Sequence, residues 1–535
     1  MRTRLVLLTL CSSLLFALAL PNELLPLGSP LIGIVCISGF LASVAVAPTG
    51  RFAALLGATF GGTSTLLSSF WLMFFQEFTV WTLGGVVLAY TGFGALLAGF
   101  LHGASRMSPV QWRPFAAALV WSVYEYLKSI GFLGYPWGLV AYPVHSVLAL
   151  IQIASVTGVW GISLIMALAN GVVAEGMIRI LSSRPFTSPS PPAYARVIAV
   201  PVSLLLLCFV FGEIRMTVES RDPAPPTATM LLVQPNTDPW KPYATEGILA
   251  NQRLTEQAIR GQATEPSETD LVVWSETSLL VDPRGRQSYY SRYPRANPLM
   301  QYLSRTGTYH LVGSAVDVDP DNMEWMNGAV LISPHGRVED FYGKQHPVPF
   351  AEAIPFWSNP TVRRFFTDVV GIHTPWVMGS RPTVFRMVDQ GGEEFTFSVP
   401  VCFEDAFANL CRRFVAKGAQ VLVNVTNDSW SRTSSALWQH FVAARFRAVE
   451  NRAALVRSTN GGITAVVDTT GRIVAALQPF TEDALTCVVP LRQGALTPYT
   501  VWGDWLPAVL TVLLLLLLVR NAAYWRRTRN VRSSS

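Results

Sequence analysis

Charged side chains are scarce in this chain. Asp, Glu, Lys and Arg make up 14% of its 535 residues, whereas 50% are apolar and the mean hydropathy is +0.35. Because soluble domains carry about 25% charged residues, this scarcity excludes a wholly soluble protein. The charges that are present are concentrated in the middle of the sequence, which excludes a membrane bundle alone. The composition therefore predicts two unlike domains.

Cysteine and histidine are also few, with six and seven copies. None of the cysteines shows a Cys-x-x-Cys or Cys/His zinc spacing, so we predict no metal site. Gly-x-Ser-x-Gly, His-Glu-x-x-His, Walker and dinucleotide-binding fingerprints are absent as well, and we expect no cofactor. Cys411 and Cys487 leave a disulfide open if they lie outside the cytoplasm, but ordinary buried thiols are the favoured interpretation.

Long apolar runs lie at both ends of the chain, and we count eight that are long enough to cross a bilayer, which takes about 20 residues. The fifth is the weakest, because Glu125 and Lys128 interrupt it. The first could instead be a cleaved signal peptide, since Arg2 and Arg4 precede it and residues 17–19 resemble a cleavage site. The runs lie near residues 4–20, 24–47, 52–75, 79–101, 115–133, 147–178, 196–213 and 504–520.

Basic residues indicate how these runs are oriented. If both termini are cytoplasmic, 13 arginines fall in the inner loops and tails, whereas the short outer loops hold only Lys128. Because short cytoplasmic loops collect Lys and Arg, we expect the long polar block outside the cytoplasm. The other 27 basic residues are outnumbered by 34 acidic ones. The pI near 9.0 therefore reflects topology, and no nucleic-acid partner is expected.

The polar block runs from about residue 228 to 500 and is long enough to form its own core. Short β-branched runs alternate in it with amphipathic helical patterns, such as residues 246–259 and 436–450. This alternation predicts a layered α/β domain. The predicted strands are residues 230–234, 271–274, 311–316, 329–332, 395–401, 421–425 and 463–467.

Three apolar runs in this block end on a reactive side chain: Glu276, Lys344 and Cys402. A thiol needs a base to become a nucleophile, and the oxyanion that it creates needs a positive group or N–H donors beside it. Glutamate and lysine can fill those two roles. Each residue alone also has a simpler interpretation, as a strand-end carboxylate, a solvated loop lysine and a small core thiol.

Histidines keep a second kind of site open. His346 or His440 could serve as the base for Cys402 in a Cys–His pair. The segment Asn424–Asp428 could either form a turn or line a site, and its spacing does not decide between them.

Taken together, these segments resemble the apolipoprotein N-acyltransferase family, the membrane-embedded branch of the nitrilase superfamily. The order Glu276, Lys344, Cys402 at strand ends is similar to the superfamily, and its combination with eight spans is similar to this branch. The resemblance covers nearly the whole chain. The matching segments are Val233–Asn236, Trp274–Glu276, Lys344–Glu352, Cys402–Glu404, Asn427–Trp430, Trp438–His440 and Arg457–Gly462 in the polar block, and Gly134–Gly138 with Glu125 in the membrane half.

The resemblance implies an α/β domain joined to a membrane α-helical bundle. A nitrilase-like α-β-β-α sandwich would be inserted between the seventh and eighth of eight transmembrane helices. The implied domains are residues 1–218 with seven spans, residues 219–503 as the extracytoplasmic catalytic domain, and residues 504–535 with the last span and a basic cytoplasmic tail. The protein would be a monomer in the cell inner membrane, with its catalytic domain in the periplasm.

The resemblance also implies a reaction. Glu276 would take the proton of Cys402, and the thiolate would attack an acyl ester of a phospholipid while Lys344 holds the oxyanion. The resulting thioester would pass the acyl chain to the α-amino group of a diacylglyceryl-cysteine on an apolipoprotein. Supporting or substrate-binding positions implied by the resemblance are Glu352, Glu404, Phe403, Trp240 and Asn427.

Two residues depart from the family pattern. Ser275 stands where the family has proline, and Phe403 stands where it has tyrosine. The second departure removes a phenolic hydroxyl, so any substrate contact of that hydroxyl is in doubt.

Two other functions are compatible with this architecture. A membrane-anchored nitrilase-type amidase could use the same three residues with water as its acyl acceptor. A transporter with an external binding domain is less favoured, because the apolar runs show no halved, repeated pattern.

Overall fold

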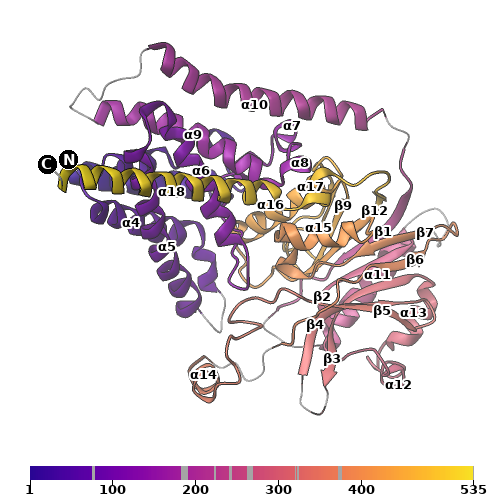
Figure 1. The fold of residues 1–535 in the computed structure, drawn as a ribbon. Coiled ribbons are helices and arrows are strands. Elements are labelled where there is room, and N and C mark those ends of the chain that lie inside the picture. The colour runs from indigo at the N-terminus through magenta and orange to yellow at the C-terminus, as the bar shows by residue number, and fades with distance from the viewer. Residues whose placement is uncertain are drawn as a thin grey trace. The chain divides into compact units, whose positions relative to one another are not determined.

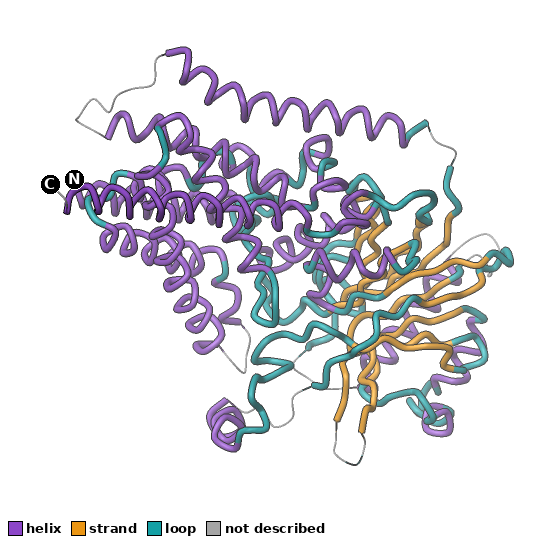
Figure 2. The backbone as a smooth tube through the Cα atoms, viewed as in Figure 1, coloured by secondary structure: helices purple, strands orange, loops and turns teal. Residues whose placement is uncertain are grey.

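The computed structural model describes residues 1–74, 79–181, 191–221, 224–239, 244–261, 269–319, 321, 324–370 and 376–533. The chain forms two compact units (Figure 1). In the described residues, strands occur in the second unit, whereas the first is built from helices (Figure 2). The first unit comprises Met1–Met73, Thr79–Ser220 and Trp502–Ser535, and the second comprises Phe74–Phe78 and Arg221–Val501.

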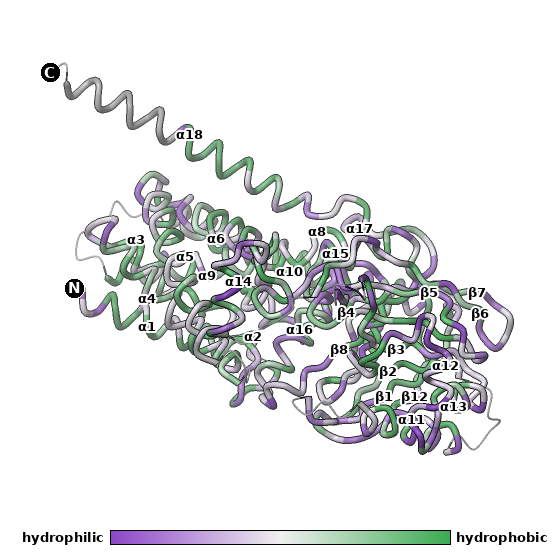
Figure 3. Tube along the Cα trace, turned by 90° about the horizontal axis from the view of Figure 1, so that it is seen from below, coloured by the Kyte–Doolittle hydropathy of each residue, from purple (hydrophilic) through white to green (hydrophobic). Residues whose placement is uncertain are grey.

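Four helices in the described part of the chain are long and apolar enough to cross a membrane. They are α1 (Arg2–Ala19), Trp81–Met107 of α5 (Thr79–Met107), α9 (Val159–Leu181) and Val197–Glu219 of α10 (Pro191–Glu219). The other expected spans fall on shorter or less apolar helices. These are α2 (Pro30–Gly33) with α3 (Ser38–Ala45), α4 (Gly50–Ser68), α6 (Arg113–Ser129) and α18 (Trp505–Ser533), whose apolar part Trp505–Arg520 is green in Figure 3.

Two of the expected spans are interrupted. The run 147–178 divides into α7 (Leu148–Ile151), α8 (Ala154–Thr157) and α9. The break before α9 is at Gly158, whose φ of +65° lies in the left-handed region that glycine adopts readily. The run 24–47 is likewise divided between α2 and α3. Mean hydropathy does not detect such breaks, because Gly158 is only weakly polar and the residues between α2 and α3, Ile34–Ile37, are apolar.

The second unit contains two six-stranded sheets. In each sheet the central strands are parallel, β1 with β2 and β3 in the first and β7 with β8 and β9 in the second. The first sheet has the order β12 (Asp483–Pro490), β1 (Thr227–Gln234), β2 (Leu271–Leu279), β3 (Tyr309–Asp319), β4 (Glu324–Ile332), β5 (Val338–Gly343). The second has the order β11 (Ile473–Ala476), β10 (Ala465–Val467), β9 (Ala454–Thr459), β8 (Val421–Thr426), β7 (Glu394–Ser398), β6 (Phe385–Val388).

The two sheets pack face to face between helices. Ser458 Oγ on β9 lies 3.1 Å from the carbonyl oxygen of Val233 on β1 and 2.9 Å from that of Val273 on β2. The first sheet is covered by α11 (Ala244–Gly261) and by α13 (Leu299–Thr306), whose buried side chains join the hydrophobic cluster of that sheet. The second sheet contacts α15 (Ala408–Ala416) and α16 (Ser434–Asn451). These layers form the α-β-β-α arrangement of the expected α/β domain.

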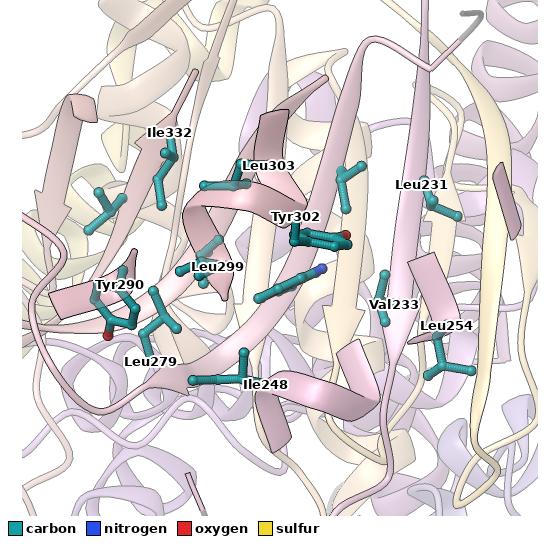
Figure 4. Close-up of a cluster of buried hydrophobic side chains, with 14 of the residues drawn as sticks. Leu231, Val233, Ile248, Leu254, Leu279, Tyr290, Leu299, Tyr302, Leu303 and Ile332 are labelled. Atoms are coloured by element: carbon teal, nitrogen blue, oxygen red, sulfur yellow. The ribbon is translucent and has the colours of Figure 1, made fainter. Parts of the chain in front are cut away.

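A buried cluster anchors β2 beneath its two covering helices (Figure 4). The rings of Trp274 and Tyr302 are fully buried with centroids 5.7 Å apart, and Trp274 Nε1 donates to Thr255 Oγ1 at 3.1 Å. Truncating a buried aromatic side chain costs about 3–5 kcal/mol. This packing therefore fixes the part of β2 that precedes Glu276.

Most predicted strands are confirmed, but the segments around two candidate residues differ from expectation. The strand before Cys402 ends at Ser398, because Pro400 has no N–H to donate to a ladder, and Val401 keeps one isolated bridge to Val425. The strand β2 does not end at Glu276 but continues to Leu279, with a register break after Trp274. Both candidate residues thus lie where regular pairing is interrupted. The strands β5, β6, β9, β11 and β12 fall outside the strands predicted from the sequence.

Candidate active site

Glu276, Lys344 and Cys402 lie together at one edge of the paired sheets. Glu276 comes from β2 and Lys344 directly follows β5, so the first sheet supplies both. Cys402 follows β7 of the second sheet and begins the short helix η5 (Cys402–Ala406). Lys344 and Glu276 are 2% and 8% exposed, and Cys402 is half-buried. The structure therefore brings together three reactive groups from distant parts of the sequence.

The Glu276 carboxylate is held from both sides. Its Oε1 accepts from Asn327 Nδ2 at 2.7 Å, and its Oε2 accepts from the backbone N–H of Asn427 at 2.9 Å. The Cys402 thiol lies close enough to this carboxylate to lower its pKa. Burial raises the pKa of Glu276, the Lys344 ammonium opposes that shift, and the nearby Glu352 carboxylate adds to it. Glu276 is thus a buried carboxylate beside the Cys402 thiol.

Lys344 is a buried cation between two carboxylates. Its Nζ donates to Glu352 Oε1 at 2.8 Å and lies 3.8 Å from Glu276 Oε1. It also lies 5.2 Å from the centre of the Phe403 ring, within range of a cation–π contact. Burial alone lowers the pKa of Lys344, but Glu352, Cys402 and Glu276 together raise it above its ordinary value. The ammonium therefore stays charged at neutral pH.

Asn327, which was not predicted from the sequence, joins the two carboxylates. Its Nδ2 donates to Glu276 Oε1 and, at 2.9 Å, to Glu352 Oε1. Its carbonyl oxygen accepts from the backbone N–H of Lys344 at 2.8 Å. Glu352 is further fixed by the backbone N–H of Val348 at 2.7 Å. The signal that could have revealed Asn327 is an amide inside the otherwise apolar run 326–332.

Cys402 has an unusual backbone conformation. Its φ is +54°, in the left-handed region that costs a non-glycine residue energy and that clusters at functional sites. Asn424 Nδ2 donates to the carbonyl oxygens of Pro400 at 2.9 Å and Cys402 at 2.8 Å, which fixes this turn. Burial raises the pKa of the Cys402 thiol, the Glu276 charge adds to the shift, and Lys344 opposes it. The resting thiol is therefore protonated and needs a base to react.

Glu404 connects the loops that carry Cys402 and Lys344. Its carboxylate accepts from the backbone N–H groups of Gln345 at 2.7 Å, His346 at 2.9 Å and Val401 at 2.8 Å. The Tyr342 hydroxyl lies 3.0 Å from both of its oxygens. Burial raises the pKa of Glu404 to about 7, against the opposing effect of the N–H donors. This one buried side chain therefore ties the second sheet to the first.

The histidines are placed differently from a Cys–His pair. His346 packs its ring against Phe407, 3.8 Å between centroids, and burial together with the Lys344 charge lowers its pKa to about 4. Its Nε2 has no hydrogen-bond partner among the described residues. Both ring nitrogens of His440 face carboxylates, Asp428 at 2.9 Å and Asp405 at 2.8 Å. Neither environment favours a histidine that accepts the thiol proton.

The other expected positions and the cysteines complete the site. Phe403 is buried and packs against the ring of His346, and the amide oxygen of Asn427 accepts from the Ser429 N–H at 3.2 Å. Trp240 lies outside the described residues. The structure holds Cys411 and Cys487 as free, buried thiols. Among the described residues, no group of His, Cys, Asp or Glu is arranged to hold a metal ion.

Comparisons with known proteins point to one family. The model "Apolipoprotein N-acyltransferase N-terminal domain" matches residues 12–172, and the model "Carbon-nitrogen hydrolase" matches residues 232–499. The chain is 37% identical over 509 residues to "Apolipoprotein N-acyltransferase 2" of Treponema denticola, covering 94% of this chain and 95% of the relative. It is 30% identical to "Apolipoprotein N-acyltransferase" of Borreliella burgdorferi, covering 97% and 96%. An amidase structure from Nesterenkonia sp. aligns with a TM-score of 0.34 at 19% identity, over 49% of this chain and 90% of the amidase.

The contacts of Asn327 predict that it controls the position and the protonation of the Glu276 carboxylate. Replacing Asn327 with alanine removes the donor shared by Glu276 and Glu352. The Asn327→Asp substitution instead adds a third carboxylate, which raises the pKa of Glu276 further and leaves it protonated. We expect alkylation of Cys402 by a soluble maleimide to slow about 10-fold in Asn327→Ala and more in Asn327→Asp. The physical reason is that a small misplacement of reactive groups can lower a reaction rate by up to ~100-fold.

Alkylation would be followed by intact mass of the purified full-length protein in detergent. The matched control is Asn359→Asp, since Asn359 is exposed and caps α14 (Pro360–Phe365) with an oxygen that aspartate also offers. Wild-type alkylation rates in both Asn327 variants would refute this role.

Proposed function

Since this chain belongs to the apolipoprotein N-acyltransferase family, we propose that it transfers a fatty acyl chain from a phospholipid, through a Cys402 thioester, to the N-terminal amine of a lipoprotein. One observation carries the mechanism. The Cys402 thiol and the buried Glu276 carboxylate lie close enough to shift each other's pKa, and Glu276 Oε1 lies 3.8 Å from Lys344 Nζ. A nucleophile, a base and a cation therefore meet at one point.

In the first half-reaction, Glu276 takes the proton of the Cys402 thiol and the sulfur attacks the ester carbonyl of the phospholipid. The carbon–oxygen bond of the ester then breaks. The proton passes from Glu276 to the leaving oxygen, and a lysophospholipid departs. The acyl chain remains on Cys402 as a thioester.

In the second half-reaction, the α-amino group of a diacylglyceryl-cysteine attacks the thioester carbon. Glu276 accepts a proton from the attacking nitrogen, and the carbon–sulfur bond breaks. The thiolate of Cys402 takes that proton back, which restores the resting enzyme and releases the N-acylated lipoprotein. One base can serve both half-reactions because the sulfur and the nitrogen attack the same carbonyl carbon in turn.

Lys344 stabilises the oxyanion of both tetrahedral intermediates. Its pKa is raised above the ordinary value, so it stays charged throughout the cycle. Glu352 holds the ammonium at 2.8 Å and keeps it from pairing more closely with the base. Phe403 presents its ring face to the same ammonium, so this position supports the cation without a phenolic hydroxyl. Glu404 and Asn427 support the site by fixing the loops and the Glu276 carboxylate.

We further propose that the polar domain faces the periplasm from the cell inner membrane. The domains are residues 1–218, 219–503 and 504–535, with eight spans and the catalytic domain between the seventh and the eighth. The four long apolar helices and the shorter ones support a multi-pass protein, and the arginine-rich short loops support this orientation. A monomer suffices, because one chain supplies every group of the site.

An apolar segment of the second unit supports a phospholipid donor. Phe356 is 80% exposed and Met378 is 50% exposed, while Ile354 packs against Trp357 and Phe366. Exposed aromatic and aliphatic side chains of this kind favour a lipid surface. Both substrates are lipid-anchored, so a site at the membrane face replaces a three-dimensional search with a lateral one. A nitrilase-type amidase would use water as acceptor and would gain nothing from this surface.

The thioester is the first test. We expect a labelled phospholipid to leave a hydroxylamine-sensitive acyl adduct on the purified protein, and a diacylglyceryl lipopeptide amine to discharge it. The adduct should be lost in Cys402→Ser, because a hydroxyl is a poor nucleophile at neutral pH. Cys411→Ser is the matched control, since a buried hydroxyl there can still donate to the Glu404 carbonyl that the thiol faces. Discharge by water at the same rate as by the lipopeptide would instead identify an amidase.

Substitutions of Glu276 and of Lys344 should impair different steps of the reaction. Glu276→Gln removes the proton acceptor, so both maleimide alkylation of Cys402 and thioester formation should become slow. Lys344→Met should cut thioester formation by on the order of 100-fold, the cost of a lost oxyanion partner. His346→Ala should leave the thioester intact. Loss of the thioester in His346→Ala, with retention in Glu276→Gln, would replace this mechanism by a Cys–His one.

Reporter fusions test the topology. A fusion within the polar domain near residue 480 should be active with a periplasmic reporter, and a fusion after Arg532 with a cytoplasmic one. A periplasmic signal from the fusion after Arg532 would exclude an even number of spans.

A further inference from the structure

Four buried charged side chains form a closed ring beside the nucleophile. Asp405, Asp428, His440 and Arg457 are each at most 5% exposed, with Asp405 and Arg457 fully buried. His440 Nε2 lies 2.8 Å from Asp405 Oδ1, and His440 Nδ1 lies 2.9 Å from Asp428 Oδ1. Arg457 Nη1 donates to Asp405 Oδ2, and its Nη2 donates to Asp428 Oδ2 at 3.1 Å. Each cation thus bridges the same two carboxylates.

The ring joins four elements of the second sheet and its covering helix. Asp405 lies in η5, three residues after the nucleophile, and Asp428 follows β8. His440 comes from α16 and Arg457 from β9. Buried charges are stable when they are paired and hydrogen-bonded, and removing one partner is costly. The ring therefore constrains η5 and the end of β8 relative to one another.

Both constrained segments carry parts of the catalytic site. The helix η5 begins at Cys402, whose φ of +54° requires support from its surroundings. Asn427 immediately precedes Asp428, and its backbone N–H donates to Glu276 Oε2 at 2.9 Å. A shift of either segment changes the distance between the thiol and its base.

We propose that Asp405, Asp428, His440 and Arg457 act as positioning residues that hold the Cys402 thiol in register with Glu276. This inference rests on the proposed function for its acyl chemistry, but its geometric content does not depend on any substrate. His440 has to donate from both ring nitrogens, because a carboxylate oxygen faces each of them. The ring is consequently complete only while His440 is protonated.

The protonation of His440 gives the ring a pH dependence of known sign. The charged groups that act on His440 are Asp428 after β8, Asp405 in η5 and Arg457 on β9. Burial lowers its pKa, but the two carboxylates outweigh burial and raise it from 6.5 to about 9. The contribution of protonated His440 to the stability of the ring is therefore complete below about pH 6.5, and it is lost as the pH rises through about 9. Above that pH, a neutral imidazole can donate to only one of the two carboxylates, so the other keeps Arg457 but loses its bond from His440.

The test compares His440→Gln with wild type in the full-length protein. We expect kcat for thioester formation to fall about 10-fold or more, since a displacement of about 1 Å can cost ~100-fold, with KM for the phospholipid little changed. The wild-type rate should decline through pH 9, and that decline should be absent in His440→Gln. His335→Gln is the matched control, because His335 is an exposed turn residue of the same domain. A wild-type rate and an unchanged alkaline decline in His440→Gln would overturn the proposal.

A second variant and a second measurement keep the test independent of folding and of the substrate. Arg457→Lys retains the charge but offers one ammonium in place of a two-pronged donor. We expect Arg457→Lys to fold, and we expect its rate of thioester formation to fall less than that of His440→Gln. Maleimide alkylation of Cys402 needs no acyl donor and should slow in both variants. Slowed alkylation without any thioester in wild type would support the ring and refute the proposed function, whereas wild-type alkylation in a folded Arg457→Lys would refute the ring.

Discussion

A carboxylate that is buried next to a thiol and a cation is the constraint on which the rest of this domain depends. Burial strengthens the interaction between Glu276 and Lys344, but it also disfavours each charge when it stands alone. The structure resolves this by surrounding the pair with fixed donors and acceptors, from Asn327, Glu352 and the Asn427 backbone. These groups are set by strand ends and tight loops, so the two sheets have to meet in one register for the charges to balance.

One of the two departures from the family pattern is explained by this arrangement. Ser275 precedes Glu276 within β2, and its backbone carbonyl accepts from the Ser278 hydroxyl at 2.7 Å. Proline would keep that carbonyl, so nothing in the structure explains this substitution. Phe403 offers a ring face to Lys344 and packs against His346 and Phe407. A tyrosine ring would present the same face. The hydroxyl is therefore not needed for the contact with the cation.

Much of this domain could be predicted from the sequence, and the missing parts share a physical cause. Glu276, Lys344 and Cys402 were identifiable because each interrupts or ends an apolar run, which is a local signal. Asn327 was not predicted because its role depends on strand pairing between distant segments. The amide in the apolar run 326–332 marks the position but does not indicate which groups it contacts.

The ring and the span boundaries could not be predicted either, because both depend on three-dimensional structure and not on a local sequence pattern. Asp405 and Arg457 are 52 residues apart, and their pairing requires knowledge of the fold. The interruption at Gly158 depends on one backbone angle, whereas hydropathy averages over a window. Short edge strands such as β11 and β6 carry little alternation, because they are only four residues long.

The division of the site between two sheets has a consequence for the life of the protein during synthesis. The base and the cation belong to the first sheet and leave the ribosome early, whereas the thiol belongs to the second and follows later. Until the sheets join, the thiol has no partner to deprotonate it and behaves like any ordinary cysteine. A chain whose two sheets have not joined therefore lacks the arrangement that would activate the thiol. The thiol becomes reactive toward the membrane only after the two sheets have joined.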